Sequence, residues 1–403
     1  MSVVVQKYGG SSVADAQKLK QVASRVMQTK QLGHDVVVVV SAMGDTTDDL
    51  LGLAKQISPN PDRRELDMLL SAGERISMAL LSMAIRELGG DAISFTGSQS
   101  GIITNDRHID ARIIEVRPFR VQDELNRGKV VVIAGYQGVS YRKEVTTLGR
   151  GGSDTTAVAM AAALGAEWCE LCSDVDGVYS ADPRVVQGAK RIPILSYEET
   201  QELAESGARV LNAQAIEFAK EKGIAIYARS TTSALPTQDP SNDGTVVRKQ
   251  APRVPGSVIG VASEKQVVVI QSHDLNRLLS LMDEAGVPCK QLHFTSVGGE
   301  QNRATLVVSK ENLHQETKLR KAINDIVYWD DTLAAVSIVG TGINASNRQT
   351  LRGSEALRAA GIGFSSIATS SFRTTWLIER DKVNEATLLL HKLFLESADA
   401  KVP

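Results

Sequence analysis

The sequence has few cysteines, few aromatic residues and almost no excess of either charge. Its 403 residues include three cysteines, an odd number and too few for a disulfide framework, which indicates a reducing compartment. The 45 basic and 47 acidic side chains leave a net charge of −2, so a chain-wide basic surface for nucleic acid is absent. No stretch reaches about 18 apolar residues, and the apolar N-terminal run is too short for a signal peptide. We therefore expect a cytoplasmic protein that binds neither nucleic acid nor a membrane.

Proline is also scarce, with 11 residues, but four prolines gather in segment 235–256. They are Pro236, Pro240, Pro252 and Pro255. The segment has no sustained periodicity, which is typical of a linker. At about 150 residues per domain the length predicts two or three domains. We expect a catalytic domain at 1–245 and two small domains at 257–330 and 331–403.

Before the linker, short apolar runs alternate with helical patterns. The runs 3–5, 36–40 and 130–134 are rich in valine, as in parallel strands buried on both faces. Segments 15–32 and 65–88 have helical spacing. In the second helix the apolar residues at steps of three or four are Leu66, Leu69, Leu70, Ile76, Leu80, Met83, Ala84 and Leu88. The alternation predicts an α/β sandwich with a mostly parallel sheet between two layers of helices.

After the linker the pattern repeats. A strand at 267–270 is followed by a helix at 275–285, and about 70 residues later a strand at 336–339 is followed by a helix at 351–360. Another strand and helix fill the interval. The repeat predicts two compact βαββαβ units.

Two glycine-rich turns can approach an anion closely. In the first, Lys7 precedes Gly9, Gly10 and Ser11 at a strand-to-helix turn, which suits phosphate oxygens, although an ordinary glycine turn would look the same. In the second, three glycines flank Arg150 before an alanine-rich helix, whose N-terminus attracts anions. Ser153 or Asp154 could serve only as the N-cap of that helix. Capping does not require the arginine, so we favour a binding function.

A third cluster, residues 173–184, holds Asp174, Asp176 and Asp182. It lacks the glutamate that an EF-hand needs at its twelfth position, so a nucleotide contact through Tyr179 and Arg184 fits better, with a surface turn as the alternative. The pair Cys169 and Cys172 lies in a strand-like run, where residues three apart face opposite sides. We therefore expect a structural role for that pair. Segment 340–345 resembles a dinucleotide fingerprint but lacks the acidic partner.

Five segments carry a combined signal: residues 7–12 (KYGGSS), 41–46 (SAMGDT), 72–75 (AGER), 148–154 (LGRGGSD) and 174–184 (DVDGVYSADPR). In this order and spacing they resemble the motifs of the aspartate kinase (aspartokinase) family. Its members are amino-acid kinases with C-terminal tandem ACT domains. The resemblance implies a three-layer amino-acid-kinase sandwich followed by two ferredoxin-like ACT domains. It also implies ATP-dependent phosphorylation of the side-chain carboxylate of L-aspartate, the first step of the aspartate-family amino-acid pathway.

The resemblance implies roles for individual residues. The implied catalytic residues are Lys7 and Asp154. The implied substrate-binding residues are Ser41, Thr46, Glu74, Arg150, Gly152 and Ser153, with Arg150 on the α-carboxylate and Glu74 on the ammonium group. The implied nucleotide-binding residues are Lys7, Gly9, Gly10, Ser11, Ser173, Asp174, Tyr179, Arg184 and Arg209. Magnesium is expected to arrive with ATP, with no metal site of the protein's own.

The implied chemistry agrees with the residue types. A carboxylate with a pKa near 3.9 is already ionised at neutral pH, so the nucleophile needs no general base. None of the six histidines lies in a motif. Catalysis should come from charge neutralisation and alignment. Two alternatives stay open: a kinase of another acidic amino acid, such as glutamate or N-acetylglutamate, and a catalytically silent subunit that only senses amino acids.

The chain departs from the family pattern in places. Arg209 stands where the family often has lysine, which keeps the charge but changes the geometry. In the ACT repeats, the segments that bind effector in the family read Val287-Pro288-Cys289 and Ile362-Gly363-Phe364 here. Resemblance also implies a homodimer or higher oligomer formed through the ACT domains.

We predict that the first ACT unit is a poor or altered site for lysine or threonine, because Pro288 has no N–H to donate to an effector carboxylate. Feedback regulation by these amino acids should then be weak or altered. Calorimetric titration with each amino acid checks this, and tight binding at the first unit would contradict it.

Overall fold

The computed structural model describes residues 2–149, 151–208, 211–235, 241–297, 301–313, 316–323 and 327–396. Its contacts form two units. Unit 1 comprises Met1–Val178, Arg191–Gln201 and Val210–Pro252, and unit 2 comprises Tyr179–Lys190, Glu202–Arg209 and Arg253–Pro403. The change of unit after Pro252 lies inside the predicted linker segment 235–256. Unit 2 also takes two short segments that precede the linker, which the sequence pattern does not indicate.

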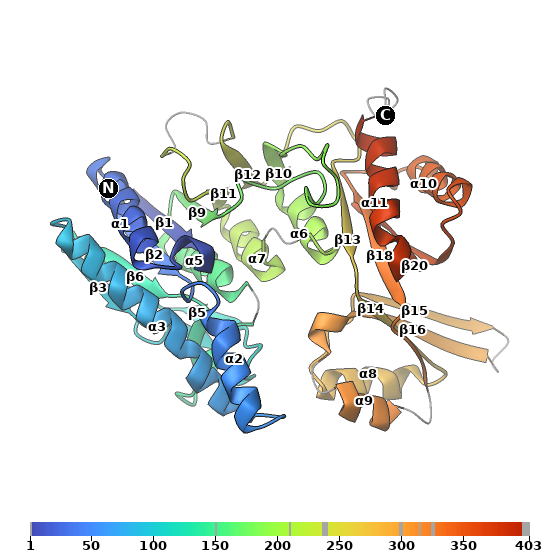
Figure 1. Ribbon diagram of the computed structural model, residues 1–403, viewed down its shortest axis with the longest axis horizontal. Coiled ribbons are helices and arrows are strands. Elements are labelled where there is room, and N and C mark those ends of the chain that lie inside the picture. The colour runs from blue at the N-terminus through green and yellow to red at the C-terminus, as the bar shows by residue number, and fades with distance from the viewer. Residues whose placement is uncertain are drawn as a thin grey trace. The chain divides into compact units, whose positions relative to one another are not determined.

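Unit 1 is built on an eight-stranded sheet with the strand order β10-β12-β11-β9-β1-β2-β6-β3 (Figure 1). Its strands are β1 (Val3–Tyr8), β2 (Asp35–Val40), β3 (Ala92–Phe95), β6 (Val130–Ala134), β9 (Trp168–Ser173), β10 (Ile194–Ser196), β11 (Ala225–Ser230) and β12 (Gly244–Arg248). Every neighbouring pair is parallel except β11 with β12. The expected mostly parallel sheet is therefore confirmed.

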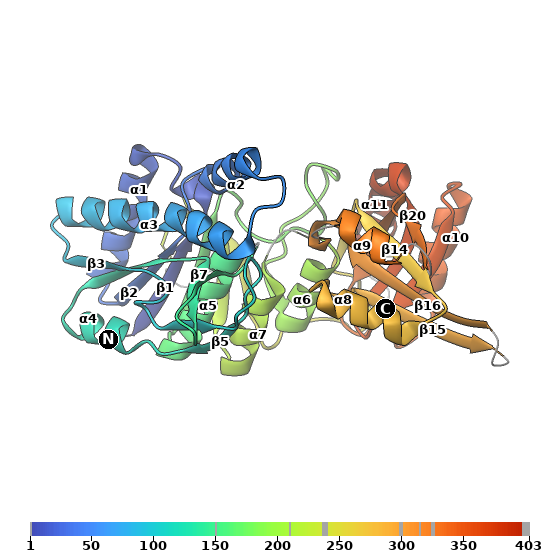
Figure 2. The ribbon, with the colours of Figure 1, turned by 90° about the horizontal axis from the view of Figure 1, so that it is seen from below.

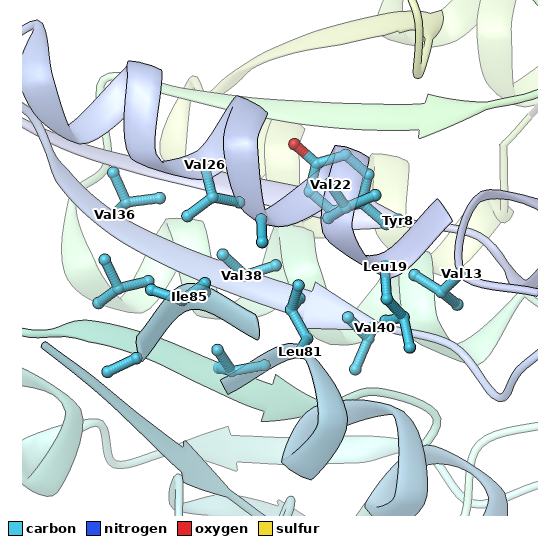
Figure 3. Packing of buried hydrophobic residues seen from close by; sticks show 14 of the residues in the cluster. Tyr8, Val13, Leu19, Val22, Val26, Val36, Val38, Val40, Leu81 and Ile85 are labelled. Carbon is cyan, nitrogen blue, oxygen red and sulfur yellow. The ribbon is translucent and has the colours of Figure 1, made fainter. Parts of the chain in front are cut away.

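Helices cover both faces of this sheet. They are α1 (Ala16–Gln31), α2 (Thr46–Ile57), α3 (Arg63–Glu87), α4 (Phe119–Asn126), α5 (Gly152–Leu164) and α7 (Ala213–Lys222), while α6 (Tyr197–Glu205) begins in unit 1 and ends in unit 2. Figure 2 shows α1 and α3 on one side of the sheet and α5 on the other. Alternate valines of β2 explain the layering, because successive side chains of a strand face opposite ways. Val36, Val38 and Val40 pack with residues of α1 and α3, among them Leu81 (Figure 3).

A second, smaller sheet in unit 1 has the order β5-β4-β7-β8. Its strands are β4 (Ile102–Thr104), β5 (Ile113–Val116), β7 (Gln137–Ser140) and β8 (Val145–Thr147). Strand β8 contacts α3 and leads through the second glycine-rich turn into α5.

Helix α3 turns a different face to the core from the one its apolar spacing predicts. Ile76, Leu80 and Met83 are exposed, with 51%, 39% and 63% of their surface accessible. The buried face instead includes polar residues; it comprises Leu66, Asp67, Leu70, Ser71, Gly73, Glu74, Ser77, Leu81, Ser82 and Ile85. By length and composition α3 could cross a membrane, but it is partly buried here, and core helices meet the same criterion.

Unit 2 contains two four-stranded antiparallel sheets, with the orders β15-β16-β14-β17 and β13-β18-β20-β19. The strands are β13 (Gly260–Glu264), β14 (Val267–Ser272), β15 (Gln291–Val297), β16 (Gln301–Ser309), β17 (Val327–Asp330), β18 (Leu333–Val339), β19 (Phe364–Thr369) and β20 (Arg373–Glu379). The helices are α8 (Leu275–Glu284), α9 (Glu316–Ile323), α10 (Arg348–Ala359) and α11 (Val383–His391), with short helices η2 (Lys310–Asn312), η3 (Arg380–Lys382) and η4 (Lys392–Glu396).

The strand pairing of β13 differs from the expected first small domain at 257–330. Elements β14-α8-β15-β16-α9-β17 form one continuous βαββαβ unit, as predicted. Strand β13, which the sequence analysis placed in that unit, pairs instead with β18 of the other sheet. The first βαββαβ unit is thus inserted between two neighbouring strands of the second. Sequence periodicity cannot show this, because the choice of strand partner is a tertiary property.

Leu81 tests the packing of the α3 core face. Replacing this fully buried residue by alanine should lower the free energy of unfolding of unit 1 by about 2–5 kcal/mol, because a cavity is left behind. Leu53→Ala is the matched control, since Leu53 is 53% exposed, and should change stability by less than about 0.5 kcal/mol. Urea denaturation followed by circular dichroism measures both, and equal losses would contradict the packing.

Candidate functional site

The predicted motif residues of unit 1 meet at one edge of its large sheet. Strands β9, β1, β2 and β6 are adjacent and parallel, so their carboxyl ends lie together. Gly9, Ser41 and Gly135 directly follow β1, β2 and β6. Their backbone N–H groups donate to carbonyl groups of the strand next to them, at 2.9 to 3.2 Å. In open α/β sheets this edge is where ligands bind.

Lys7 and Asp154 form an ion pair at this edge. Lys7 is the penultimate residue of β1, and Asp154 lies in the first turn of α5. Lys7 Nζ lies 2.7 Å from Asp154 Oδ1, and the side chains are only 13% and 17% exposed. The N-terminus of α5 adds the positive end of the helix dipole. Asp154 therefore holds the ammonium group of Lys7 beside the N-terminus of α5, which attracts anions.

The first glycine-rich turn is held close to the neighbouring loop. It forms a short helix, η1 (Gly10–Ser12). A Cβ on Gly10 would lie 2.9 Å from the carbonyl oxygen of Ala42 and 3.0 Å from that of Gly44, so only glycine fits. The Ser11 side chain is exposed. The predicted loop residues Gly9, Gly10 and Ser11 therefore lie next to Lys7, where an anion can approach the backbone.

Glu74 is a buried carboxyl group on α3. It is 3% exposed, and its Oε1 accepts a hydrogen bond from the Ala42 N–H at 3.2 Å. Its Oε2 is buried, and no partner for it is found among the described residues. Burial raises the pKa of Glu74 to about 7. A buried, half-satisfied carboxyl group is costly, and a ligand cation or donor at Oε2 would remove that cost.

Ser41 and Thr46 flank the loop that contacts Glu74. The Thr46 hydroxyl donates to the Met43 carbonyl at 2.6 Å, which closes the turn into α2. Ser41 is half-buried, and its backbone is bonded to the end of β1. Ser41 and Thr46 thus bound the loop between β2 and α2, whose residue Ala42 contacts both Gly10 and Glu74.

The second glycine-rich turn leads into α5. Gly149 and Gly151 have left-handed backbones, with φ of +72° and +74°, which other residues rarely adopt. Gly152 opens the helix, and a Cβ there would lie 2.7 Å from the Leu148 side chain. Ser153 is 7% exposed. Arg150, the predicted ligand of a carboxylate, lies outside the described residues.

A pocket of about 340 Å³, part of it open to solvent, lies at this edge. It is lined by Lys7, Asp154, Leu171, Cys172, Ser173, Val175, Gly177, Leu211, Ala228 and Arg229. The structure therefore brings Lys7, Asp154 and Ser173 together as predicted. Among the described residues no group of three or more His, Cys, Asp or Glu side chains could hold a metal ion.

The remaining predicted nucleotide residues are distributed differently. Asp174 is exposed in unit 1, directly after β9. Tyr179 and Arg184 belong to unit 2, where the Arg184 guanidinium pairs with Asp182 at 2.8 Å and is largely exposed. Arg209 lies outside the described residues.

Sequence reasoning missed several charged residues near the site. Arg229, which lines the pocket, is buried and pairs with Glu170 at 3.3 Å. The buried Asp67 and the half-buried His108 form a pair beside the second glycine-rich turn, with His108 Nδ1 2.7 Å from Asp67 Oδ2. The seven-residue spacing of Asp67 and Glu74 on one helix is a signal that could have identified Asp67. No sequence pattern marks His108.

Comparison with known proteins gives consistent results. The sequence profile of the amino acid kinase family matches residues 2–230. The chain is 44% identical to an aspartokinase of Mycolicibacterium smegmatis over 412 aligned positions, covering 98% of this chain and 96% of the relative. It is 41% identical to an aspartokinase of Corynebacterium glutamicum, covering 98% and 96%.

Solved structures show the same fold. E. coli aspartokinase III, solved in complex with aspartate and ADP, superposes with a TM-score of 0.82 at 24% identity, covering 97% of this chain and 99% of that one. Aspartate kinase from Synechocystis is 34% identical with a TM-score of 0.56, covering 97% of this chain and 69% of that one. The expected sandwich with two ferredoxin-like domains is therefore confirmed.

The Glu74 carboxyl group can be titrated directly. In the ligand-free protein labelled with ¹³C-glutamate, we expect one carboxyl resonance with a midpoint of about pH 7, because burial disfavours its ionised form. Glu74→Gln should remove that resonance and identify it. Glu115→Gln is the control, since Arg117 holds the pKa of the exposed Glu115 below its usual value. A Glu74 midpoint near 4.5 would contradict the prediction.

Proposed function

Because this chain belongs to the amino acid kinase family and, within it, to the aspartokinases, we propose that it transfers the γ-phosphoryl group of ATP to the side-chain carboxylate of L-aspartate. The product is 4-phospho-L-aspartate, and the reaction is the first step of the aspartate-family pathway. The observation that carries the proposal is the ion pair of Lys7 on β1 with Asp154 at the start of α5. The half-satisfied carboxyl group of Glu74 on α3, which accepts the Ala42 N–H, supports it.

The main difficulty of this reaction is electrostatic, because an anionic carboxylate must approach a polyanion. Lys7 supplies a positive charge to the phosphates, and Asp154 holds its ammonium group in place. The turn that contains Gly9, Gly10 and Ser11 lies beside Lys7, and its glycines let phosphate oxygens approach the backbone closely. The N-terminus of α5 completes a site that stabilises negative charge on the transferring group. No general base is needed, because the nucleophile is already ionised.

The aspartate substrate is recognised by its charges. Glu74 accepts the α-ammonium group at Oε2, which supplies the partner that this buried oxygen otherwise lacks. Arg150 holds the α-carboxylate, since a guanidinium can bind a carboxylate through two hydrogen bonds. The remaining substrate-binding residues are Ser41, Thr46, Gly152 and Ser153. A free α-amino acid is thus favoured over an N-acylated one.

The nucleotide lies along the end of β9 in this proposal. Its ligands in unit 1 are Lys7, Gly9, Gly10, Ser11, Ser173 and Asp174. Magnesium is bound through the nucleotide phosphates, and the single carboxylate of Asp154 fits the preference of this ion for one or two carboxylates together with phosphates and water.

The C-terminal half is proposed to regulate the enzyme. We assign residues 1–245 to catalysis and residues 257–330 and 331–403 to two ACT domains, with β13 completing the second one. A related E. coli enzyme was solved with lysine and aspartate. In this chain Pro288 makes lysine or threonine a weak or altered effector of the first ACT domain. A homodimer or higher oligomer forms through the ACT domains, in the cytoplasm.

A coupled assay of ADP release tests the function and separates the alternatives. We expect turnover with L-aspartate and little with L-glutamate or N-acetyl-L-glutamate. A preference for either of the latter would indicate a kinase of another acidic amino acid, and no turnover with any would indicate a silent amino-acid sensor.

Lys7→Ala should lower kcat for aspartate by at least about 100-fold, as expected when one group that stabilises transition-state charge is removed. Lys30→Ala is the matched control, since it also breaks a partly buried lysine ion pair, with Asp35 at 2.9 Å, but lies on α1 outside the site. Circular dichroism should show both variants folded. Normal turnover by Lys7→Ala would refute the role of Lys7.

A further inference from the structure

Two residues beside the second glycine-rich turn have strained backbones. Among the described residues, three that are not glycine have positive φ: Ile109 at 73°, Tyr136 at 66° and Lys143 at 64°. Lys143 lies in the turn between β7 and β8. Ile109 lies in the loop between β4 and β5, and Tyr136 lies in the bend between β6 and β7. A β-branched or bulky residue is strained in this conformation. Strain of this kind persists only where surrounding contacts impose it.

Both strained residues touch the glycine-rich turn. The Tyr136 carbonyl accepts the Leu148 N–H at 2.9 Å. A Cβ on Gly152 would lie 3.0 Å from the ring of Tyr136, so the ring packs directly on the start of α5. A Cβ on Gly149 would lie 3.3 Å from the carbonyl oxygen of Ile109. The turn is therefore contacted by both strained residues.

A single buried carboxylate holds this arrangement together. Asp67 has no exposed surface. Its Oδ1 accepts the Ile109 N–H at 3.0 Å and also the hydroxyl of Thr147, the last residue of β8. Its Oδ2 accepts from His108 Nδ1 at 2.7 Å, if that nitrogen carries the proton as a carboxylate partner requires.

The same helix carries Asp67 and Glu74. They are seven residues apart on the buried face of α3, two turns and about 10 Å along its axis. An α-helix is rigid over that length. Asp67 therefore ties the glycine-rich turn, which bears Gly152 and Ser153, to the element that presents Glu74.

We propose that Asp67, His108 and Tyr136 are positioning residues that fix the glycine-rich turn relative to Glu74 and so set the affinity for the amino-acid substrate. The inference rests on the proposed function, since that function places the ammonium group on Glu74 and the α-carboxylate on the turn. An amino acid bound at both ends requires a fixed spacing between the two groups. The nucleotide-binding residues Lys7, Gly9 and Gly10 lie on β1 and the turn after it, which Asp67 does not contact, so KM for ATP should change less than KM for aspartate.

Kinetics of three variants test the inference. Asp67→Asn keeps the size of the side chain but offers only one acceptor atom, and should lower kcat/KM for aspartate by about 100-fold, the effect expected of a displacement near 1 Å. His108→Ala removes one hydrogen bond to Asp67, and Tyr136→Ala removes the ring that packs on the start of α5. Each should raise KM for aspartate by about three- to tenfold. KM for ATP should stay within about twofold in all three. His34→Ala is the matched control, because it breaks a similar 2.7 Å contact, with Ser2, away from the turn.

Hydrogen–deuterium exchange of the ligand-free protein supplies a readout that needs no turnover. We expect faster exchange at residues 145–149 and 108–111 in Asp67→Asn than in the wild type or His34→Ala. If the wild type phosphorylates no amino acid, the proposed function fails, while the exchange still decides whether Asp67 holds the turn. Unchanged exchange, or an equal rise in KM for ATP and aspartate, would overturn the inference. Should Asp67→Asn not fold, His108→Ala and Tyr136→Ala decide it by the same measurements.

Discussion

Parallel pairing of four central strands is the constraint on which the site depends. Because β9, β1, β2 and β6 run the same way, the loops that follow them must gather at one edge of the sheet. Lys7 comes to that edge from the first strand, and α5 brings Asp154 to it from a distant part of the chain. The Lys7 ammonium group and the positive end of the α5 dipole therefore lie together at that edge.

The second requirement is a polar face buried beneath this edge. Helix α3 places Asp67, Ser71, Glu74 and Ser77 in the interior, where an apolar face would stabilise the fold more. Asp67 finds three donors, so its burial is compensated. Glu74 does not, and burial raises the pKa of Glu74 to about 7. Helix α3 thus carries one buried carboxylate, Asp67, whose oxygens are hydrogen-bonded, and one buried carboxyl group, Glu74, whose Oε2 can receive a ligand.

Individual elements show which features of the fold can be predicted from the spacing of apolar residues. Strands β1, β2 and β6 could be predicted because a parallel strand buried on both faces must be apolar throughout. The core face of α3 could not, because Ile76, Leu80 and Met83 have helical spacing yet are exposed, while polar groups are buried for the sake of the site. His108 lies in no motif and reaches Asp67 only through the folding of the small sheet.

By itself the sequence determined the fold class, the motif residues and their family, because these depend on local composition and on short spacings along the chain. Which strand pairs with β13, which residues join Lys7 in the pocket, and the contacts among Asp67, Ile109 and Tyr136 were decided only by the tertiary structure. The physical reason is that hydrogen bonds and burial act between groups close in space. Local spacing carries no record of which distant segments fold together.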